Sequence, residues 1–391
     1  EFRNELKSGV GSEGQPRFIT GGARNVSQIF DNIKAQPHNF VADQPGDVVP
    51  YIEAHDNLTL YDVIAQSIKK DPDIAENNME IHKRIRIGNA MVLTAQGTAF
   101  IHAGQEFGRT KQWRAEATEA PYKSTYMTDK DGNPFLFPYF IHDSYDSSDI
   151  INRFDWEKAT NAELYPINNV TREYTAGLIA LRRSTDAFRL GSKELVDANV
   201  TMVAAPEVKE QDLVVAYRSE ATNGDAYYVF VNADMQARTF TIGEDLTAGV
   251  VVVDGDEAGV VEVSERSGFE LTSESITLEP LTTVVVKVSA DGVGTDPGDG
   301  EEPGDGNEPG DGNEPGDGNE PGDGNEPGEG NEPGEGTTPG DGKDKDKGKE
   351  KKDKEEKDKK DKKDKKSAGD KAENKLPNTA TNTYNWLLLG S

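Results

Sequence analysis

The sequence predicts an α/β domain, then an all-β domain, then a disordered tail. Three observations lead to this prediction. Strand-like and helix-like segments alternate over residues 1–190, six short segments rich in Val, Thr and Tyr follow in residues 191–290, and residues 291–391 contain very few large apolar side chains. Alternating strands and helices are typical of a parallel α/β domain, whereas consecutive short strands between Gly, Asp and Asn clusters are typical of a β-sandwich or small barrel.

The charge and the cysteine count exclude several classes of function. The chain of 391 residues has a formal net charge of −29, a pI near 4.6 and no cysteine. Nucleic-acid binding needs a basic surface, so we expect no nucleic-acid partner. Disulfides, thiolate metal sites and a cysteine nucleophile are excluded. The charged opening "EFRNELKS" has no methionine and the chain stops in a short apolar run, so we expect a piece of a longer protein.

The α/β portion is predicted from five segments of residues 1–190. Helical periodicity is present in residues 23–36, 80–97 and 171–185, with Gly97 as the C-cap of the second helix. Short apolar runs in residues 48–54 and 98–104 predict strands. Strand, helix, strand and helix follow one another, which is the order of a βα domain.

The all-β domain is predicted from six segments separated by turn residues. These segments, for example "DAYYVFVNAD" and "LTTVVVKVS", are rich in Val, Thr and Tyr, which favour β-structure. We expect an antiparallel sandwich or small barrel. The predicted strands lie within residues 212–219, 225–234, 237–243, 249–256, 268–280 and 281–289.

The tail divides into three segments. Residues 291–342 repeat "PGDGNE" with a period of six, which predicts a disordered, extended linker. The rival interpretation, a calcium-binding repeat, lacks the apolar position that such repeats use to stack. Residues 343–375 are a Lys/Asp/Glu run and predict a solvated spacer.

The last segment, residues 376–391, carries "LPNTA" followed by "WLLLGS". This resembles a sortase sorting signal, truncated after its first apolar residues, with Ala380 where the usual pattern has Gly. The resemblance implies that sortase and peptidoglycan are partners, and that the parent protein is secreted and anchored to the cell wall of a Gram-positive bacterium.

A candidate active site follows the first predicted strand, where "YIEA" is followed by His55, Asp56 and Asn57. Successive residues of a strand alternate between its faces, so Glu53 and His55 share one face and Asp56 lies on the other. Catalytic groups of β/α barrels lie at the C-terminal ends of strands. The alternative is an ordinary polar turn.

Three longer motifs give this site a family resemblance. They are "YIEAHDNLTLYD" (51–62), "RIRIGNAMVLTAQGTAFIHAGQEFGRTK" (84–111) and "SYDSSDIINRFDW" (144–156). Together they resemble the type I pullulanases of the α-amylase superfamily, which hydrolyse α-1,6-glucosidic links in pullulan, glycogen and amylopectin. The resemblance implies that residues 1–190 are the C-terminal portion of a (β/α)8 TIM barrel with strands seven and eight, and that residues 191–290 are the β-sandwich that follows.

The resemblance also implies the roles of individual residues. Asp56 would stabilise the transition state and His55 would hydrogen-bond the same sugar. Asn57 would contact substrate beside them, and Asp149 with Arg153 would form an acid–arginine pair that holds a glucose farther along the α-glucan.

Two essential groups are missing from these motifs. A retaining glycosidase needs a carboxylate nucleophile and a carboxylic acid about 5 Å apart. In this family they lie on strands four and five, upstream of this chain, so we expect the chain alone to be inactive. Two alternatives stay open: a non-catalytic surface adhesin that binds glycans, and a related debranching enzyme acting on glycogen or starch.

The remaining expectations concern cofactors and assembly. We expect a monomer. No cofactor is called for, and calcium stays the one open candidate. The segment "DKDGN" (129–133) is similar to the start of a calcium-binding loop, but Pro134 occupies the required Gly position. It therefore predicts a hairpin turn.

Overall fold

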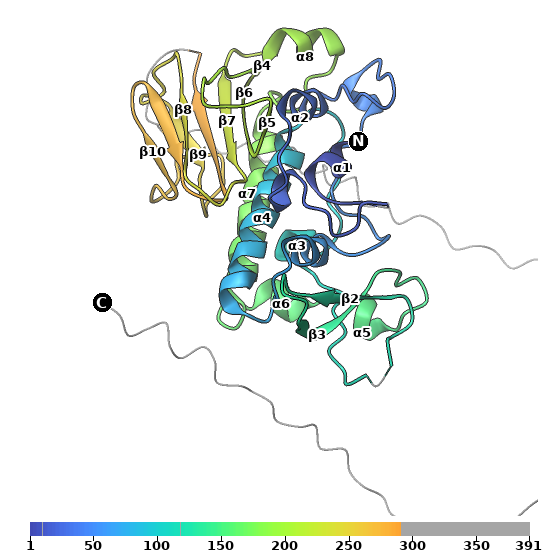
Figure 1. Ribbon diagram of the computed structural model, residues 1–391. Coiled ribbons are helices and arrows are strands. Elements are labelled where there is room, and N and C mark those ends of the chain that lie inside the picture. Colours follow the sequence, from blue (N-terminus) through green and yellow to red (C-terminus); the bar gives the residue numbers. More distant parts are fainter. Residues whose placement is uncertain (10, 118, 291–391) are drawn as a thin grey trace, which may run out of the picture. The chain divides into compact units, whose positions relative to one another are not determined.

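The computed structural model describes residues 1–9, 11–117 and 119–290, and its helices precede most of its strands along the chain (Figure 1). The predicted linker, spacer and sorting signal (291–342, 343–375 and 376–391) lie outside the described residues. The α-helices are α1 Phe2–Leu6, α2 Val26–Ile33, α3 Leu60–Ile68, α4 Ala75–Thr94, α5 Asp149–Asn152, α6 Trp156–Thr160, α7 Pro166–Ser184 and α8 Lys193–Asn199. The 3-10 helices are η1 Phe18–Thr20, η2 Pro45–Asp47 and η3 Gln105–Phe107. The strands are β1 Arg24–Asn25, β2 Ser124–Thr128, β3 Pro134–Ile141, β4 Val200–Met202, β5 Gln211–Asp212, β6 Val214–Glu220, β7 Ala226–Asn232, β8 Arg238–Thr241, β9 Val250–Val253, β10 Phe269–Leu271, β11 Ser275–Leu278 and β12 Thr282–Val288.

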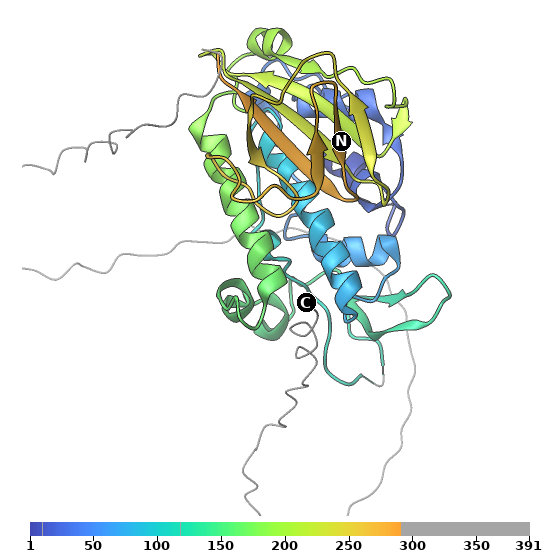
Figure 2. The same ribbon diagram turned by 90° about the vertical axis from the view of Figure 1, so that its left-hand side faces the viewer.

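Two long helices, α4 and α7, lie side by side along the molecule (Figures 1 and 2). Both were predicted, although α4 begins at Ala75, five residues before the predicted start at residue 80. Polar pairs fix their contact: Asn89 donates from Nδ2 to Thr175 Oγ1 at 3.0 Å. The Arg182 guanidinium on α7 donates to the carbonyls of Leu93 and Ala95 at 2.9 and 2.6 Å, which satisfies the free end of α4.

The prediction of strands at residues 48–54 and 98–104 is wrong, because neither segment forms a regular strand. The two segments run side by side in the same direction, because Thr98 donates to the Val48 carbonyl at 2.9 Å and Phe100 to the Pro50 carbonyl at 3.1 Å. The ladder is interrupted because Pro50 has no N–H to return the next bond. The Val48 N–H is also occupied, since it donates to the Pro45 carbonyl at 3.1 Å. This portion is therefore mixed α/β, without a parallel sheet among its described residues.

The predicted hairpin turn at residues 129–133 is confirmed. It joins β2 to β3, which pair antiparallel with Ser124 opposite Ile141. The side chain of Asp129 organises the turn, because its Oδ1 accepts the N–H groups of Asp131 at 2.9 Å and Asn133 at 2.8 Å. Gly132 has φ of +86°, a conformation that favours glycine.

The predicted β-sandwich is confirmed as two antiparallel sheets. One has the order β4-β6-β7-β12-β9 and the other the order β10-β11-β8. Their facing sides bury an apolar core in which the rings of Phe230 and Phe240 are 5.5 Å apart in an edge contact. Every residue of β7 is buried, because the opposite face of the five-stranded sheet packs against the helical portion.

The helical portion and the sandwich share a continuous core. Tyr217 of β6 is fully buried and its hydroxyl lies 2.5 Å from Thr94 Oγ1 at the end of α4. Tyr174 of α7 donates to the Asp254 carbonyl at 3.2 Å. The contact is closest at Gly177, where an added Cβ would lie 1.8 Å from the carbonyl oxygen of Ala258.

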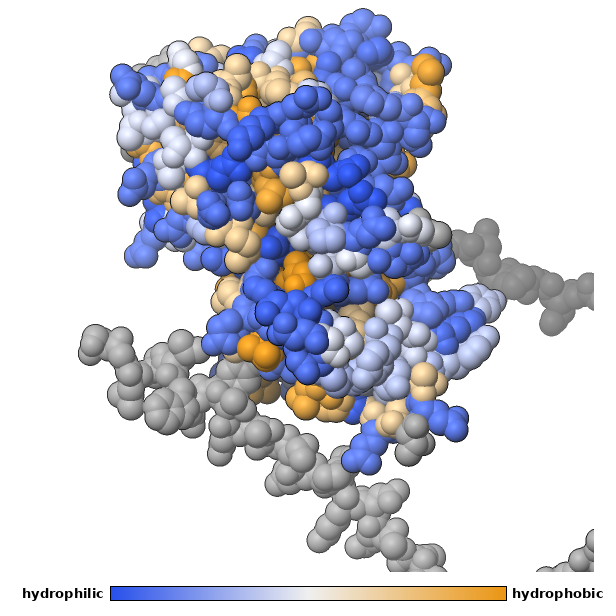
Figure 3. Space-filling model, viewed as in Figure 1, coloured by the Kyte–Doolittle hydropathy of each residue, from blue (hydrophilic) through white to orange (hydrophobic). Residues whose placement is uncertain are grey.

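The surface is mostly hydrophilic on the face drawn in Figure 3, with apolar side chains in small, separate patches. Within the ranges that the structure describes, none of the helices combines the length and the apolar character needed to cross a bilayer.

The Gly177 contact gives a first prediction. Substituting Gly177→Ala forces α7 and the Ala258 loop apart, which we expect to lower the free energy of unfolding by about 2 kcal/mol despite the gain of ~1 kcal/mol in helix propensity. Urea denaturation measures the change. The matched control is Gly259→Ala, where no atom lies within 4 Å of the added Cβ. A Gly177→Ala protein as stable as this control would contradict the prediction.

Candidate functional site

The candidate site is the short loop of residues 53–60, whose two ends are joined by the side chain of Glu53. This carboxylate is 1% exposed. Its Oε2 accepts the N–H of Leu60 at 2.6 Å, at the first residue of α3, and its Oε1 lies 2.8 Å from Nδ1 of His102. A carboxylate at a helix N-terminus is favoured by the helix dipole and by the free N–H groups there. Glu53 thus closes the loop and ties it to residues 98–104.

His55 and Asp56 lie at the tip of this loop. His55 Nε2 is 3.3 Å from Asp56 Oδ1, and their side chains are 86% and 76% exposed. Asn57 follows with φ of +62°, a left-handed turn that Asn tolerates better than most residues. The two side chains are in contact with each other, although they were expected on opposite faces of a strand, and both are open to a ligand.

The residues of this loop line two different pockets. Ala54, Asp56 and Asn57 line a pocket of about 300 Å³, whereas His55 lines another pocket of about 290 Å³ together with His102, which Glu53 bonds. The predicted strict alternation does not extend through the bend, because consecutive Asp56 and Asn57 line the same pocket and the His55 and Asp56 side chains are in contact.

Two buried charged groups, Lys111 and Asp62, support the loop. Lys111 is 2% exposed and its ammonium donates to the carbonyl of Asn57 and, at 3.3 Å, to Ser144 Oγ. Asp62 accepts the Lys111 N–H at 2.9 Å and the Thr110 hydroxyl. Burial raises the pKa of Asp62 to about 6, against the lowering effect of these donors.

The Asp56 pocket contains further charged groups. Lys7 lines it, and burial lowers the pKa of the Lys7 ammonium to about 8, partly offset by Glu53. Glu13 lines it as well, and its pKa is lowered by its own backbone N–H and by that of Gly11. A carboxyl whose pKa is lowered is ionised at neutral pH, so Glu13 does not suit the role of proton donor.

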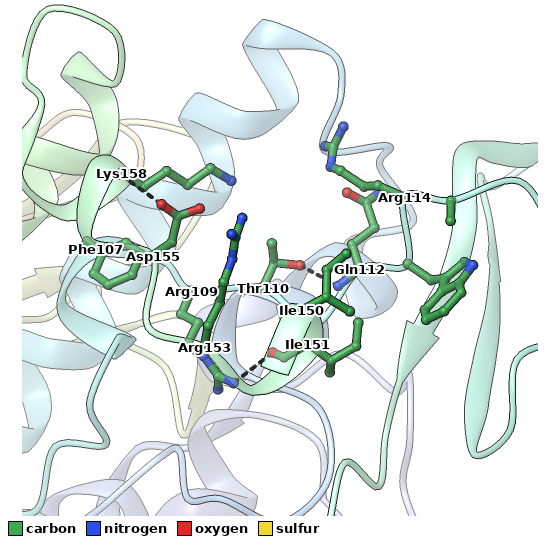
Figure 4. A pocket seen from close by; sticks show the side chains of 12 residues that line it. Phe107, Arg109, Thr110, Gln112, Arg114, Ile150, Ile151, Arg153, Asp155 and Lys158 are labelled. Atoms are coloured by element: carbon green, nitrogen blue, oxygen red, sulfur yellow. Dashed lines mark hydrogen bonds between the residues drawn. The ribbon is translucent and has the colours of Figure 1, made fainter. Parts of the chain in front are cut away.

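Asp149 and Arg153 lie at the two ends of α5, away from the Asp56 pocket. Arg153 donates its backbone N–H to the Asp149 carbonyl at 2.7 Å. No ion pair among the described residues joins their side chains, so the predicted grip of carboxylate on guanidinium is not formed. Instead, Arg153 lines a separate pocket with Arg109 and Lys158 (Figure 4).

The residues that support the loop were not among the predicted site residues. The sequence places Glu53 on the face opposite Asp56 but does not indicate its bond to His102. The one signal for this bond is that residues 48–54 and 98–104 were both predicted as strands, which makes a partner for Glu53 on the neighbouring segment expected. Nothing in the sequence pattern pointed to Lys111 or Asp62.

Metal binding has no support in this part of the chain. Across the described ranges, no three His, Asp or Glu side chains are grouped so that they could hold a metal ion. The repeat considered for calcium lies outside these ranges.

Comparisons with known proteins relate both portions to streptococcal enzymes. Residues 199–289 match the family described as SpuA C-terminal. The chain is similar to pullulanase A of Streptococcus pneumoniae, with 54% identity over 305 residues, which is 75% of this chain and 24% of that protein. It is also similar to a pullulanase of Bacillus subtilis, with 30% identity over 178 residues, 46% of this chain and 19% of that protein. The chain therefore spans about a quarter or less of these relatives.

Solved structures give the same relationship. The catalytic module of the multi-modular glycogen-degrading pneumococcal virulence factor SpuA superposes with a TM-score of 0.73 at 53% identity, covering 76% of this chain and 43% of that one. The pullulanase SAP of Group B Streptococcus gives 0.69 at 51% identity, covering 74% of this chain and 38% of that one. The mixed α/β portion and the β-domain are thus homologous to part of a pullulanase catalytic module and the SpuA C-terminal domain.

Asp62 gives a prediction about pH. Because its folded pKa of about 6 lies above the ordinary 3.8, the folded state binds the proton more tightly than the unfolded state. The stability that Asp62 contributes is complete below pH 3.8 and is lost as the pH rises through about 6. The loss amounts to about 3 kcal/mol.

Asp62→Asn removes this titration while keeping the shape of the side chain. We expect the stability of the wild-type chain relative to Asp62→Asn to fall as the pH rises from 4 to 7, roughly the window between the two pKa values. Denaturation curves at several pH values measure it, with the exposed Asp131→Asn as control. A difference that stays constant with pH would refute the raised pKa.

Proposed function

Because the chain is homologous to the catalytic module of pullulanases, we propose that it forms part of an enzyme that hydrolyses α-1,6-glucosidic branch links in α-glucans. One observation carries the proposal: the similarity to SpuA and SAP is highly specific at 51–53% identity and spans about three quarters of this chain. We further propose that residues 48–56 and 98–104 correspond to the seventh and eighth strands of a (β/α)8 barrel, with domain boundaries near residues 190 and 290.

In this proposal Asp56 stabilises the transition state. Glycoside hydrolysis passes through an oxocarbenium-like state, and a fixed carboxylate beside the developing positive charge lowers its energy. The loop geometry suits this role, because Glu53 and Lys111 hold the backbone on both sides of Asp56 while its side chain stays unburied. His55 would donate a hydrogen bond to a hydroxyl of the same sugar ring.

The remaining site residues would contact neighbouring sugars. Asn57 lines the pocket of Asp56 and offers both an acceptor and a donor. Asp149 and Arg153 would contact a glucose farther along the α-glucan. Each would bind different hydroxyls of that sugar, since the two side chains are not paired with one another. The solved SAP pullulanase in complex with maltotetraose supports an oligosaccharide of α-glucose as the class of ligand.

The nucleophile and the acid would come from outside this chain. Both oxygens of Glu53 are occupied, and the lowered pKa of Glu13 disfavours proton donation. Neither group therefore supplies the missing pair that the mechanism requires. These observations also favour a second candidate function, in which the exposed His55 and Asp56 bind a glycan without cleaving it.

We propose a location for the parent protein from the segments outside the described residues. The "LPNTA" motif (376–380) would serve as a sorting signal for a sortase, and the repeat (291–342) and spacer (343–375) would carry the enzyme away from the peptidoglycan. Secretion and anchoring to a Gram-positive cell wall follow from this assignment.

Maltotetraose binding tests the role of Asp56. We expect the 391-residue chain to bind maltotetraose, and Asp56→Ala to weaken the affinity about tenfold, the effect of losing one hydrogen bond to a charged group. Isothermal titration calorimetry measures both. Asp131→Ala, which removes an exposed carboxylate from the β2–β3 turn, is the control. If Asp56→Ala binds as tightly as the wild type, Asp56 does not contact the glucan.

Release of maltotriose from pullulan tests the missing pair. We expect no release by the 391-residue chain, because the nucleophile and the acid of this proposal lie outside it. Reducing-sugar assays and chromatography detect the product. Release by a purified chain would show that both carboxyl groups are already present, and would also exclude the purely binding function.

A further inference from the structure

A second pocket, of about 320 Å³, contains an unusual concentration of positive charge. Its lining includes Arg109, Arg114, Arg153 and Lys158, with Asp155 as the carboxylate among the lining residues. Figure 4 shows Arg109, Arg153, Asp155 and Lys158 on one side and Arg114 on the other. This local excess of cations stands out in a chain whose formal net charge is −29.

Most of this charge is not neutralised by neighbours. Arg109 donates to a backbone carbonyl, that of Ile151, at 3.1 Å. Arg114 is paired with Asp73 at 2.5 Å. Arg153 has no ion pair or side-chain hydrogen bond to any described residue, so its planar set of donors is free.

Lys158 is partly buried near both signs of charge. Its pKa is lowered first by burial and then by the charge of Arg114, while the carboxylates of Asp155, Asp73 and Asp62 act in the opposite direction. Asp155 Oδ1 is used by the backbone N–H of Lys158 at 3.1 Å. An anion between Lys158 and Arg153 would add a further favourable charge to the desolvated ammonium.

The pocket also has an apolar side. Phe107 and Ile151 are buried in the wall, and Ile150 is 66% exposed. A ligand with one charged end and one less polar body matches a pocket with guanidinium groups on one side and apolar side chains beside them.

We propose that this pocket binds a phosphate monoester. A phosphate carries close to two negative charges at neutral pH and presents three acceptor oxygens, which suits a lining with several cations better than a carboxylate does. Arg153 would supply a bidentate contact and Lys158 a point charge. The phosphate would come either free or attached to a sugar whose ring lies along Phe107 and Ile150.

The anion site shares Arg153 with the proposed glucan contacts, and Arg109 lines both this pocket and the pocket of His55. Lys158 has no part in the proposed glucan site. Uncharged maltotetraose with Asp56→Ala therefore reports on the glucan site, and phosphate ligands with Lys158→Gln report on the anion site. Failure of one proposal is distinguishable from failure of the other.

Calorimetric titration of the 391-residue chain tests the proposal, using inorganic phosphate, glucose 6-phosphate and glucose at one physiological ionic strength. We expect both phosphates to bind and glucose to give no signal at the same concentrations. Arg153→Gln should weaken phosphate binding about tenfold, since it removes a charge-assisted contact. Lys158→Gln removes a second charge independently and should weaken it as well.

The matched control is Arg183→Gln, which removes one exposed cation from α7 outside this pocket. Tighter binding of glucose 6-phosphate than of phosphate would assign the pocket to a sugar-borne phosphate. Equal affinity for glucose 6-phosphate and inorganic phosphate would support an anion site that recognises the phosphate group alone. Absence of binding, or equal binding by wild type, Arg153→Gln and Lys158→Gln, would overturn the proposal.

Discussion

The arrangement of the candidate site depends on the buried carboxylate of Glu53. An ionised carboxylate in the interior is costly unless hydrogen-bond donors surround it. Glu53 finds them in two different places, the first N–H of α3 and the ring of His102. Because residues 53 and 60 are thereby fixed to each other, the intervening residues must turn sharply and expose His55 and Asp56. Lys111 then holds the turn at the carbonyl of Asn57.

The site loop is anchored to the rest of the molecule through the end of α4. The last carbonyls of a helix need partners, and here the Arg182 guanidinium supplies them at Leu93 and Ala95 and reaches Gly97 at 2.7 Å. Burial lowers the pKa of Arg182 to about 10, so the group still carries its charge at neutral pH. The segment that begins at Thr98 is thus directed from a fixed point toward Val48 and onward to His102.

The difference between what the sequence did and did not reveal has a physical basis. Most strands of the sandwich were predictable because Val, Thr and Tyr side chains mark them locally, and α4 and α7 because their helical segments are long. The short strand β4 was not predicted, and β10, which has none of these residues, was not separated from β11. Residues 48–54 resemble a strand by the same criterion, but a single missing N–H at Pro50 interrupts the ladder. The bonds of Glu53 to His102 and of Lys111 to Asn57 join residues about fifty positions apart, and no local pattern encodes them.

The pocket of Asp56 and the pocket of Arg153 also differ in the charges of their lining residues. Around Asp56, carboxylates and ammonium groups are mixed, so a neutral sugar with many hydroxyls finds both donors and acceptors. Around Arg153, cations predominate. The overall negative charge of the chain does not cancel this local excess, because at physiological salt the field of distant charges is screened within about 8 Å. Arg109 lines both the Arg153 pocket and that of His55, so its guanidinium lies between the cation-rich lining and the loop that carries His55.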